Sequence, residues 1–305
     1  MINMKSIAFF GLLSVACSSE TINFAEGTGG QAGAAGAAGA AGVGGMVCDR
    51  SKSFSQPTPI AELVSGQDGV LRLSPDLLTA YWMSTRAGGA GNLDLYSAVR
   101  VNSESPFTGI TNLSVLNSAA PDVLPTVAGD GLSIFFESGR SGASHLYMAS
   151  RSTTALDFGV PALMANVNSS VNDGNPFVRQ DGQVLYFESD RAGTPDIYRA
   201  TWDGSAFVSP TAVDEINTPG GDGYPAVTPN DLTIYWASSR SDGGAKGNLD
   251  IWTATRGNSD EAFANMRPVV ELNSAAGEVP SFVTADDCTL FVSSDAVYAA
   301  TRGSD

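Results

Sequence analysis

The sequence predicts an all-β protein, a five-bladed β-propeller whose last blade is closed by an N-terminal strand. Three observations support this prediction: one pattern of about 50 residues recurs five times, turn-forming residues are abundant, and no long amphipathic helical pattern occurs after Asp49. Of the 305 residues, 34 are Gly and 15 are Pro. Because both residues destabilise helix interiors, this composition favours short strands joined by tight turns.

Each copy of the pattern contains signals for four strands, lettered A to D from the centre outward. Strand A ends at a polar turn residue, which is Asp76, Asp130, Asp181, Asn230 or Asp286. Strand B follows with a hydrophobic triplet such as Leu185-Tyr186-Phe187, and strand C with a pair such as Ile197-Tyr198. Strand D begins at an aromatic residue, which is Phe107, Phe158, Phe207 or Phe263.

The strand count predicts how the ring closes. A fifth D pattern lies before the first strand A, at residues 54–63, whereas the chain stops at Asp305 just after the fifth strand C. We therefore expect the N-terminal segment to supply the outer strand of the last blade, beside Val297-Tyr298. A ring closed in this way leaves no large unpaired strand edge.

The repeat resembles the WD40-like β-propeller repeats of TolB-like periplasmic proteins, the Ser-Pro-Asp-Gly type. The residues that carry this resemblance are Ser74-Pro75-Asp76, Ser84, Arg86, Asp181-Gly182, Ser189-Asp190-Arg191 and Asp196-Ile197-Tyr198. The sequence departs from the pattern at Ala128-Gly129, at Asn230-Asp231 and in the last blade, which lacks the Arg. The resemblance covers about residues 54–302. It implies a propeller of the cell envelope that makes protein–protein contacts, and it implies no enzymatic activity.

The first 47 residues indicate secretion followed by a tether. Residues 1–16 contain one basic residue, Lys5, and an apolar run that is too short to span a bilayer but suits a signal peptide. The run ends at Cys17 in a pattern similar to the lipobox of bacterial lipoproteins, although Ser14 occupies the usual Leu position. We expect a lipid on Cys17, with an ordinary secretion signal as the alternative. Residues 17–47, rich in Gly and Ala, are predicted to be a flexible tether before a propeller at residues 48–305.

Charge and composition exclude several partners. The net charge is −16, which argues against nucleic acid, since phosphate binding needs clustered Lys and Arg. One His and three Cys in the whole chain argue against a zinc site, and we expect no metal and no cofactor. The lipid implies contact with the membrane, and the resemblance implies an envelope protein as a partner; a small polar ligand is the other expected partner. We expect a monomer on the outer membrane, on its periplasmic side or at the cell surface.

Two cysteines remain after Cys17. Cys48 stands just before the closing strand D, and Cys288 opens strand B of the same blade. Strands B and D of an antiparallel blade start at the same face, so we expect a disulfide in an oxidising compartment. It would staple the ring shut.

One face of the ring, where the D–A and B–C loops open, gathers charged residues. The acids just before each inner strand are Asp68, Asp122, Asp173, Asp222 and Glu278. Strand B ends on the same face with Arg86, Arg140, Arg191 and Arg240, and His145 replaces an Asp in blade 2. One interpretation is a rim of charges that binds a polar ligand. The other is structural, with each Arg paired to a loop acid such as Asp94, Asp196 or Asp250.

The inner strands, such as Phe177-Val178-Arg179, contain no Asp or Glu before their terminal turns. A glycosidase needs two carboxylates about 5–9 Å apart, so the sequence favours a noncatalytic binding or scaffolding module. Two alternatives stay open: a glycan-active enzyme that uses the rim carboxylates, and a passive structural surface protein.

Overall fold

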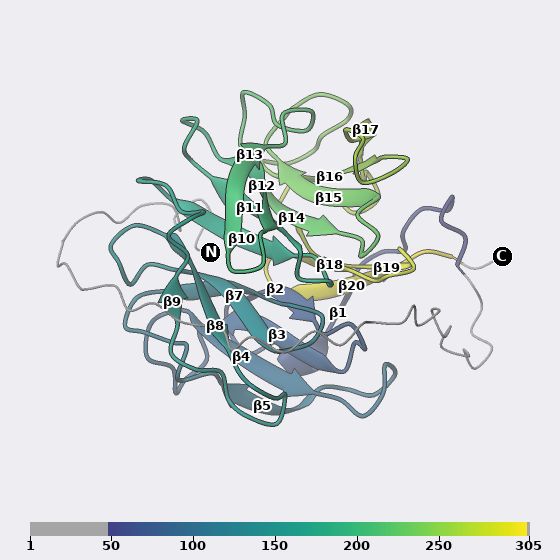
Figure 1. The fold of residues 1–305 in the computed structure, drawn as a ribbon. Coiled ribbons are helices and arrows are strands. Elements are labelled where there is room, and N and C mark those ends of the chain that lie inside the picture. The colour runs from purple at the N-terminus through teal and green to yellow at the C-terminus, as the bar shows by residue number, and fades with distance from the viewer. Residues whose placement is uncertain (1–47, 304–305) are drawn as a thin grey trace, which may run out of the picture.

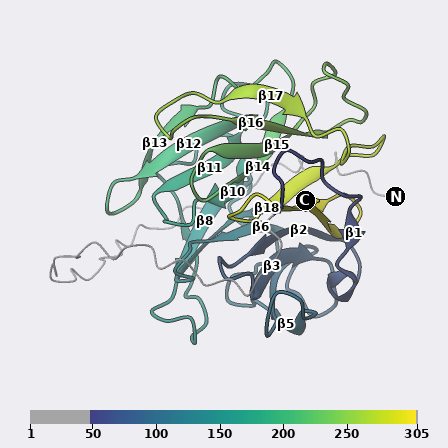
Figure 2. The ribbon, with the colours of Figure 1, turned by 90° about the vertical axis from the view of Figure 1, so that its right-hand side faces the viewer.

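The structure, a computed structural model, describes residues 48–303. These residues form five four-stranded antiparallel sheets arranged around an axis, which confirms the predicted five-bladed propeller (Figures 1 and 2). The predicted signal peptide, Cys17 and the tether lie outside the described residues. Within residues 48–303, no helix is long and apolar enough to cross a membrane.

In blades 1 to 4, the strands run from the centre outward in chain order. Blade 1 contains β2 (Asp68–Leu73), β3 (Thr79–Ser84), β4 (Asp94–Val99) and β5 (Thr108–Asn112). Blade 2 contains β6 (Asp122–Val127), β7 (Ser133–Ser138), β8 (His145–Ser150) and β9 (Ala162–Leu163). Blade 3 contains β10 (Asp173–Val178), β11 (Val184–Ser189), β12 (Asp196–Trp202) and β13 (Phe207–Ala212). Blade 4 contains β14 (Asp222–Val227), β15 (Thr233–Ser238), β16 (Asp250–Thr255) and β17 (Ala264–Pro268).

Blade 5 joins the two ends of the chain. Its strands are β18 (Val279–Val283), β19 (Thr289–Ser293), β20 (Val297–Thr301) and the N-terminal β1 (Thr58–Pro59). Thr58 pairs with Ala299 and Pro59 with Tyr298, and a short 3-10 helix, η2 (Ala61–Leu63), follows. In Figures 1 and 2 the purple N-terminal segment accordingly lies against the yellow C-terminal strands.

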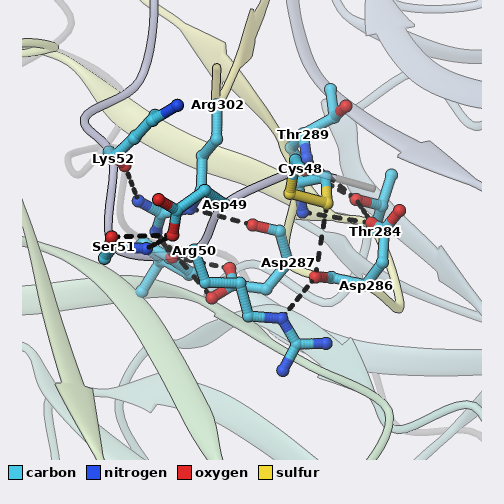
Figure 3. The surroundings of a disulfide bond; sticks show 12 residues. Cys48, Asp49, Arg50, Ser51, Lys52, Thr284, Asp286, Asp287, Thr289 and Arg302 are labelled. Carbon is cyan, nitrogen blue, oxygen red and sulfur yellow. Dashed lines mark hydrogen bonds and ion pairs between the residues drawn. A yellow bond between two sulfur atoms is a disulfide. The ribbon is translucent and has the colours of Figure 1, made fainter. Parts of the chain in front are cut away.

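A disulfide reinforces this closure. Cys48 and Cys288 are joined by a disulfide; their Cα atoms are 5.8 Å apart, and the two residues are 240 positions apart in the sequence (Figure 3). Beside it, Arg50 Nε donates a 2.8 Å hydrogen bond to the carbonyl of Asp286. The segment that enters blade 5 is therefore held covalently as well as by strand pairing.

The hydrophobic core lies between blades. The aromatic residues of the second strands are buried there, as their strand register predicts: Tyr81, Trp82, Tyr235 and Trp236 are each at most 4% exposed. Closer to the axis, every inner strand contains a bulge. Val70, Leu124, Tyr224 and Val279, from four different inner strands, pack in one cluster and therefore meet near the axis.

Candidate functional site

The rim charges predicted from the sequence pair with one another inside each blade. The four ion pairs are Arg86–Asp68, Arg140–Asp122, Arg191–Asp173 and Arg240–Asp222, and the four acids are at most 5% exposed. Each Asp is the first residue of an inner strand rather than a loop residue before it. These carboxylates are therefore neutralised inside the fold.

Blade 1 illustrates how each Arg is fixed. Arg86 Nε donates to the Ser84 hydroxyl at 2.9 Å, and Nη2 donates to the Leu63 carbonyl at 2.7 Å and to Asp68 at 3.0 Å. The guanidinium also lies 4.9 Å from the ring centroid of Trp82, a cation–π distance. The pair thus ties the incoming segment to its own blade, and it recurs in blades 2 to 4.

The expected partners of these Arg residues have other roles, which corrects the structural interpretation. Asp94 accepts backbone N–H bonds from Ala90 and Gly91, and Asp250 does so from Lys246 and Gly247, so these acids shape the B–C loops. His145 stands at the position of Asp94, Asp196 and Asp250, but Arg140 does not lose its carboxylate partner, because it pairs with Asp122.

The last two predicted rim residues take local partners. His145 Nδ1 lies 2.9 Å from the Ser141 hydroxyl. Glu278 is 7% exposed and accepts a bond from the Ser274 backbone N–H at 2.9 Å.

Two carboxylates that the sequence did not single out lie on the second strands of blades 2 and 3. Glu137 and Glu188 each reach into the next blade: a Cβ placed on Gly174 would lie 2.1 Å from Glu137 Oε2, and one on Gly223 would lie 1.9 Å from Glu188 Oε2. Asn175 bridges them, since its backbone N–H donates to Glu137 at 3.3 Å and its amide Nδ2 donates to Glu188 at 2.6 Å. Gly174 and Gly223 are therefore strand residues that make room for these acids, and not the turn residues that an Asp-Gly pair suggests.

Burial shifts the ionisation of this pair. Burial, and next the charge of Glu137, raise the pKa of Glu188 to about 8. Burial also raises the pKa of Glu137, although hydrogen bonds from Ser144 and Asn175 oppose the shift. Asn175 Oδ1 is buried without a hydrogen-bond partner among the described residues. Burial therefore favours the protonated form of both carboxyls, most strongly for Glu188.

Arg72 is the opposite case, a buried cation without a carboxylate. It starts in blade 1, lies 4.9 Å from the Phe177 ring of blade 3 and donates to the Pro225 carbonyl of blade 4 at 3.3 Å, so it crosses the axis. Its Nε and Nη1 have no hydrogen-bond partner within residues 48–303. Burial lowers the pKa of Arg72 to about 9, and a cavity of about 10 Å³, room for one water molecule, adjoins it.

A second motif joins neighbouring blades on the face that carries the turns between the first and second strands, opposite the face of the rim pairs. Between blades 3 and 4, Asp231 accepts from the Tyr186 hydroxyl at 2.7 Å, from Arg256 at 2.7 Å and from Arg179 at 2.9 Å. Between blades 4 and 5, Asp287 accepts from the Tyr235 hydroxyl at 2.7 Å, and Arg302 donates to that hydroxyl at 2.8 Å. We call this arrangement the Tyr–Arg–Asp triad.

The interface between blades 1 and 2 has the Tyr and the Arg of this triad but not the Asp. Arg151 Nη2 donates to the Tyr81 hydroxyl at 3.3 Å, while Gly131 occupies the position of Asp231 and Asp287. A groove of about 800 Å³ lies here, within the size range of ligand sites. Its lining includes Asp76, Tyr81, Thr111, Ser114, Asp130, Gly131, Arg151, Asp157 and Phe158.

Comparison with known proteins supports the fold and leaves the function open. No family model matches the sequence, and no curated protein is found as a relative. TolB from Acinetobacter baumannii is similar in structure, with a TM-score of 0.51 and 14% identity over 79% of this chain and 56% of that chain. The chain therefore spans about half of that protein. Putative TolB from Agrobacterium tumefaciens gives a TM-score of 0.49 and 14% identity over 82% and 90% of the two chains.

Enzymes are also among the similar structures. Kuenenia stuttgartiensis hydrazine synthase has a TM-score of 0.50 and 14% identity over 74% of this chain and 35% of that chain. At such identities the likeness shows the fold alone. The chain is a β-propeller similar in structure to TolB and to other propellers, and its function has to be argued from its own residues.

Proposed function

We propose that this protein is a lipid-anchored propeller of the bacterial cell envelope that acts as a noncatalytic binding module. The observation that carries the proposal is the groove between blades 1 and 2. It is large enough for a small ligand or a peptide, and it lies at an interface that keeps the Tyr and the Arg of the triad but has Gly131 where blades 4 and 5 have Asp231 and Asp287. The repeated rim pairs, in contrast, serve the fold of each blade.

The proposed location follows from the N-terminal sequence. Cys17 would carry the lipid and residues 17–47 would hold the propeller away from the membrane as a monomer. Metabolic labelling with a palmitate analogue, followed by membrane fractionation, tests this directly. We expect label and membrane association in the wild type and neither in C17A; labelled C17A protein would place the lipid elsewhere.

Binding through the groove is tested by crosslinking in the envelope. A photo-crosslinking amino acid is placed at Ser114, an exposed lining residue, and, as a control, at the exposed Met266 of blade 4. We expect an adduct from the groove position only, and none with a lipidated tether that lacks the propeller. Equal adducts at both positions, or none at Ser114, would count against a binding function of the groove.

Glu137 and Glu188 support a second candidate, a glycan-active enzyme. A carboxyl with its pKa raised to about 8 can serve as a general acid beside a second carboxylate. Turnover on a panel of envelope glycans that disappears in E188Q would replace the noncatalytic proposal. No turnover by the wild-type protein would remove this candidate.

A further inference from the structure

The three Tyr–Arg interfaces share their geometry down to individual atoms. In each, the Arg Nε donates to the carbonyl of the turn residue, at 2.8 Å for Gly131, 2.7 Å for Asp231 and 2.9 Å for Asp287. Each guanidinium also stacks on the Phe that begins the outer segment, at 3.9–4.2 Å from the ring centroid. The turn residues share a left-handed backbone, with φ of 71°, 61° and 59°. The interfaces thus differ mainly in one side chain.

The missing side chain is the one that neutralises the Arg. Arg256 contacts Asp231 at 2.7 Å, whereas Arg151 has no carboxylate partner among the described residues and donates to two carbonyls and one hydroxyl. A guanidinium has five N–H donors, so Arg151 keeps donors to spare. Burial raises the pKa of Tyr81, which keeps its hydroxyl protonated and able to donate. A carboxylate at this position would find a Tyr hydroxyl and an Arg, which match two of the three donors that hold Asp231.

The interface between blades 2 and 3 shows that Gly at this turn does not by itself imply a ligand. Gly182 occupies the equivalent position there, but Trp202 replaces the Arg and Phe135 replaces the Tyr. Both pack against Phe207, at 5.2 Å and 5.6 Å between ring centroids. The interface between blades 2 and 3 therefore lacks all three residues of the triad, whereas the interface between blades 1 and 2, beside the groove, has two of them.

Acidic residues line the outer part of the groove. Asp76, Asp130 and Asp157 are exposed, while Tyr81 is 4% exposed and lies deeper. These acids repel a simple anion, and they attract a molecule that carries a positive charge some distance from its carboxylate. The charge pattern from depth to rim therefore matches a zwitterion.

We propose that the groove binds a zwitterionic ligand, an amino acid or short peptide, whose carboxylate contacts Arg151 and Tyr81 and whose ammonium group faces the acidic rim. The ligand carboxylate takes the place that Asp231 and Asp287 hold in the other two triads. This inference rests on the proposed function, because it names the ligand class of the same groove.

The test uses the dipeptide Lys-Ala, its C-terminal amide and Glu-Ala, titrated into the protein by calorimetry. We expect Lys-Ala to bind at one site, and the amide, which lacks the carboxylate, to bind at least tenfold more weakly. Glu-Ala should also bind more weakly, because its side chain faces the acidic rim. Equal affinity for Lys-Ala and its amide would overturn the inference.

The decisive variant supplies the missing carboxylate from the chain itself. In G131D, the new side chain would begin 3.7 Å from Arg151 Nη2, with only the methyl of the exposed Thr154 at 3.0 Å to be moved aside. We expect G131D to remain folded and to lose at least tenfold in affinity for Lys-Ala. The matched control is G182D, which has the same turn and no Arg–Tyr pair, and it should bind as the wild type does.

The outcomes separate this inference from the proposed function. Adducts at Ser114 together with no binding of Lys-Ala, or with binding unchanged in G131D, would leave a binding module whose ligand is not a zwitterion, and the inference would fail. Lys-Ala binding that G131D removes, without any protein adduct at Ser114, would support a small-ligand site and exclude a protein partner at the groove.

Discussion

The interface between blades 3 and 4 and the interface between blades 1 and 2 share a Tyr–Arg contact, but the first is filled by a carboxylate and the second borders a groove. Both bring a Tyr from one blade against an Arg from the next, at 3.3 Å in each case. Asp231 fills its position in the first interface and is fully buried, whereas the second interface has Gly131 at that position and a groove of about 800 Å³ beside it. The proposed site therefore uses a structural motif that lacks one side chain, and it needs no new element.

The largest expected effect comes from opening the filled interface. D231A removes a buried carboxylate that contacts Arg179, Arg256 and Tyr186, and it leaves Arg256 without a carboxylate partner among residues 48–303, while Arg179 keeps Asp181. Loss of one partner of a buried pair costs about 3–5 kcal/mol, and we expect that loss in the free energy of unfolding, measured by urea denaturation. D242A, on the surface of the same blade, is the control and should change it by less than about 0.5 kcal/mol. A similar small change in D231A would mean that the triad does not hold blades together.

Blade 5 sharpens the comparison, because its turn supplies Asp287 to the triad with blade 4 and its next residue, Cys288, forms the disulfide with Cys48. Replacing Cys48 and Cys288 together by Ala should lower the free energy of unfolding by about 2–5 kcal/mol. The reason is that the unfolded chain is no longer closed into a loop spanning 240 positions. An unchanged urea midpoint would show that β1 pairing alone closes the ring.

Glu137 and Glu188 are buried carboxyls without a cationic partner within residues 48–303, and a variant of Glu188 can measure the effect of this burial on stability. The pKa of Glu188 is raised from 4.5 to about 8, so within that pH window the folded state holds a proton that the unfolded state has lost. Stability should therefore fall as pH rises through the window. In E188Q the contribution of Glu188 to this dependence disappears, while that of Glu137, whose pKa burial also raises, remains. At pH 9 the variant should be more stable than the wild type by about 2 kcal/mol, allowing for the partial exposure of the carboxyl. E104Q, at an exposed position, serves as control; parallel pH profiles for wild type and E188Q would contradict the assignment.

The next expected effect converts the open interface into the filled one. G131D should form the missing triad, and a hydrogen bond to a charged group contributes about 1.5–3 kcal/mol. The left-handed backbone at residue 131, with φ of 71°, costs a side chain about 1–2 kcal/mol, so we expect a net rise in the free energy of unfolding of about 1 kcal/mol. G182D, beside Trp202, should bring no gain. A destabilised G131D protein would show that the two interfaces differ by more than one side chain.

The smallest expected effect concerns Arg72, a buried cation without a carboxylate. Its guanidinium has one hydrogen bond and one ring contact to offset its desolvation. Replacing such a group by an apolar side chain of similar length is often neutral or stabilising, so R72M should change the free energy of unfolding by less than about 1 kcal/mol. A loss above about 3 kcal/mol would instead make Arg72 an essential brace across the axis.

The fold could be predicted from the sequence because every blade repeats the same local signals and because a fifth strand D precedes the first strand A. The sequence also predicted where in each blade the rim charges lie, but it did not predict which Arg pairs with which Asp. Arg86 lies next to Asp68 only because β2 and β3 pair in register, and the Trp82 and Tyr96 rings then hold the guanidinium in place.

The groove and the acidic pair could not be predicted, because each joins residues from different blades. Tyr81 and Arg151 are 70 positions apart, and Glu188 lies against Gly223 of the next blade. A signal was nevertheless present in the aligned repeats. Gly131 stands where blades 4 and 5 have Asp231 and Asp287, and Glu137 and Glu188 stand where blades 1 and 4 have the hydrophobic Met83 and Ala237.

The central claim is that one absent carboxylate turns a blade interface into a binding site. The most direct measurement is the dissociation constant of Lys-Ala for the wild-type, G131D and G182D proteins, by calorimetry under one set of conditions. We predict similar values for the wild type and G182D, and a value at least tenfold higher for G131D. Equal values for G131D and G182D, or no binding to the wild type, would contradict the claim.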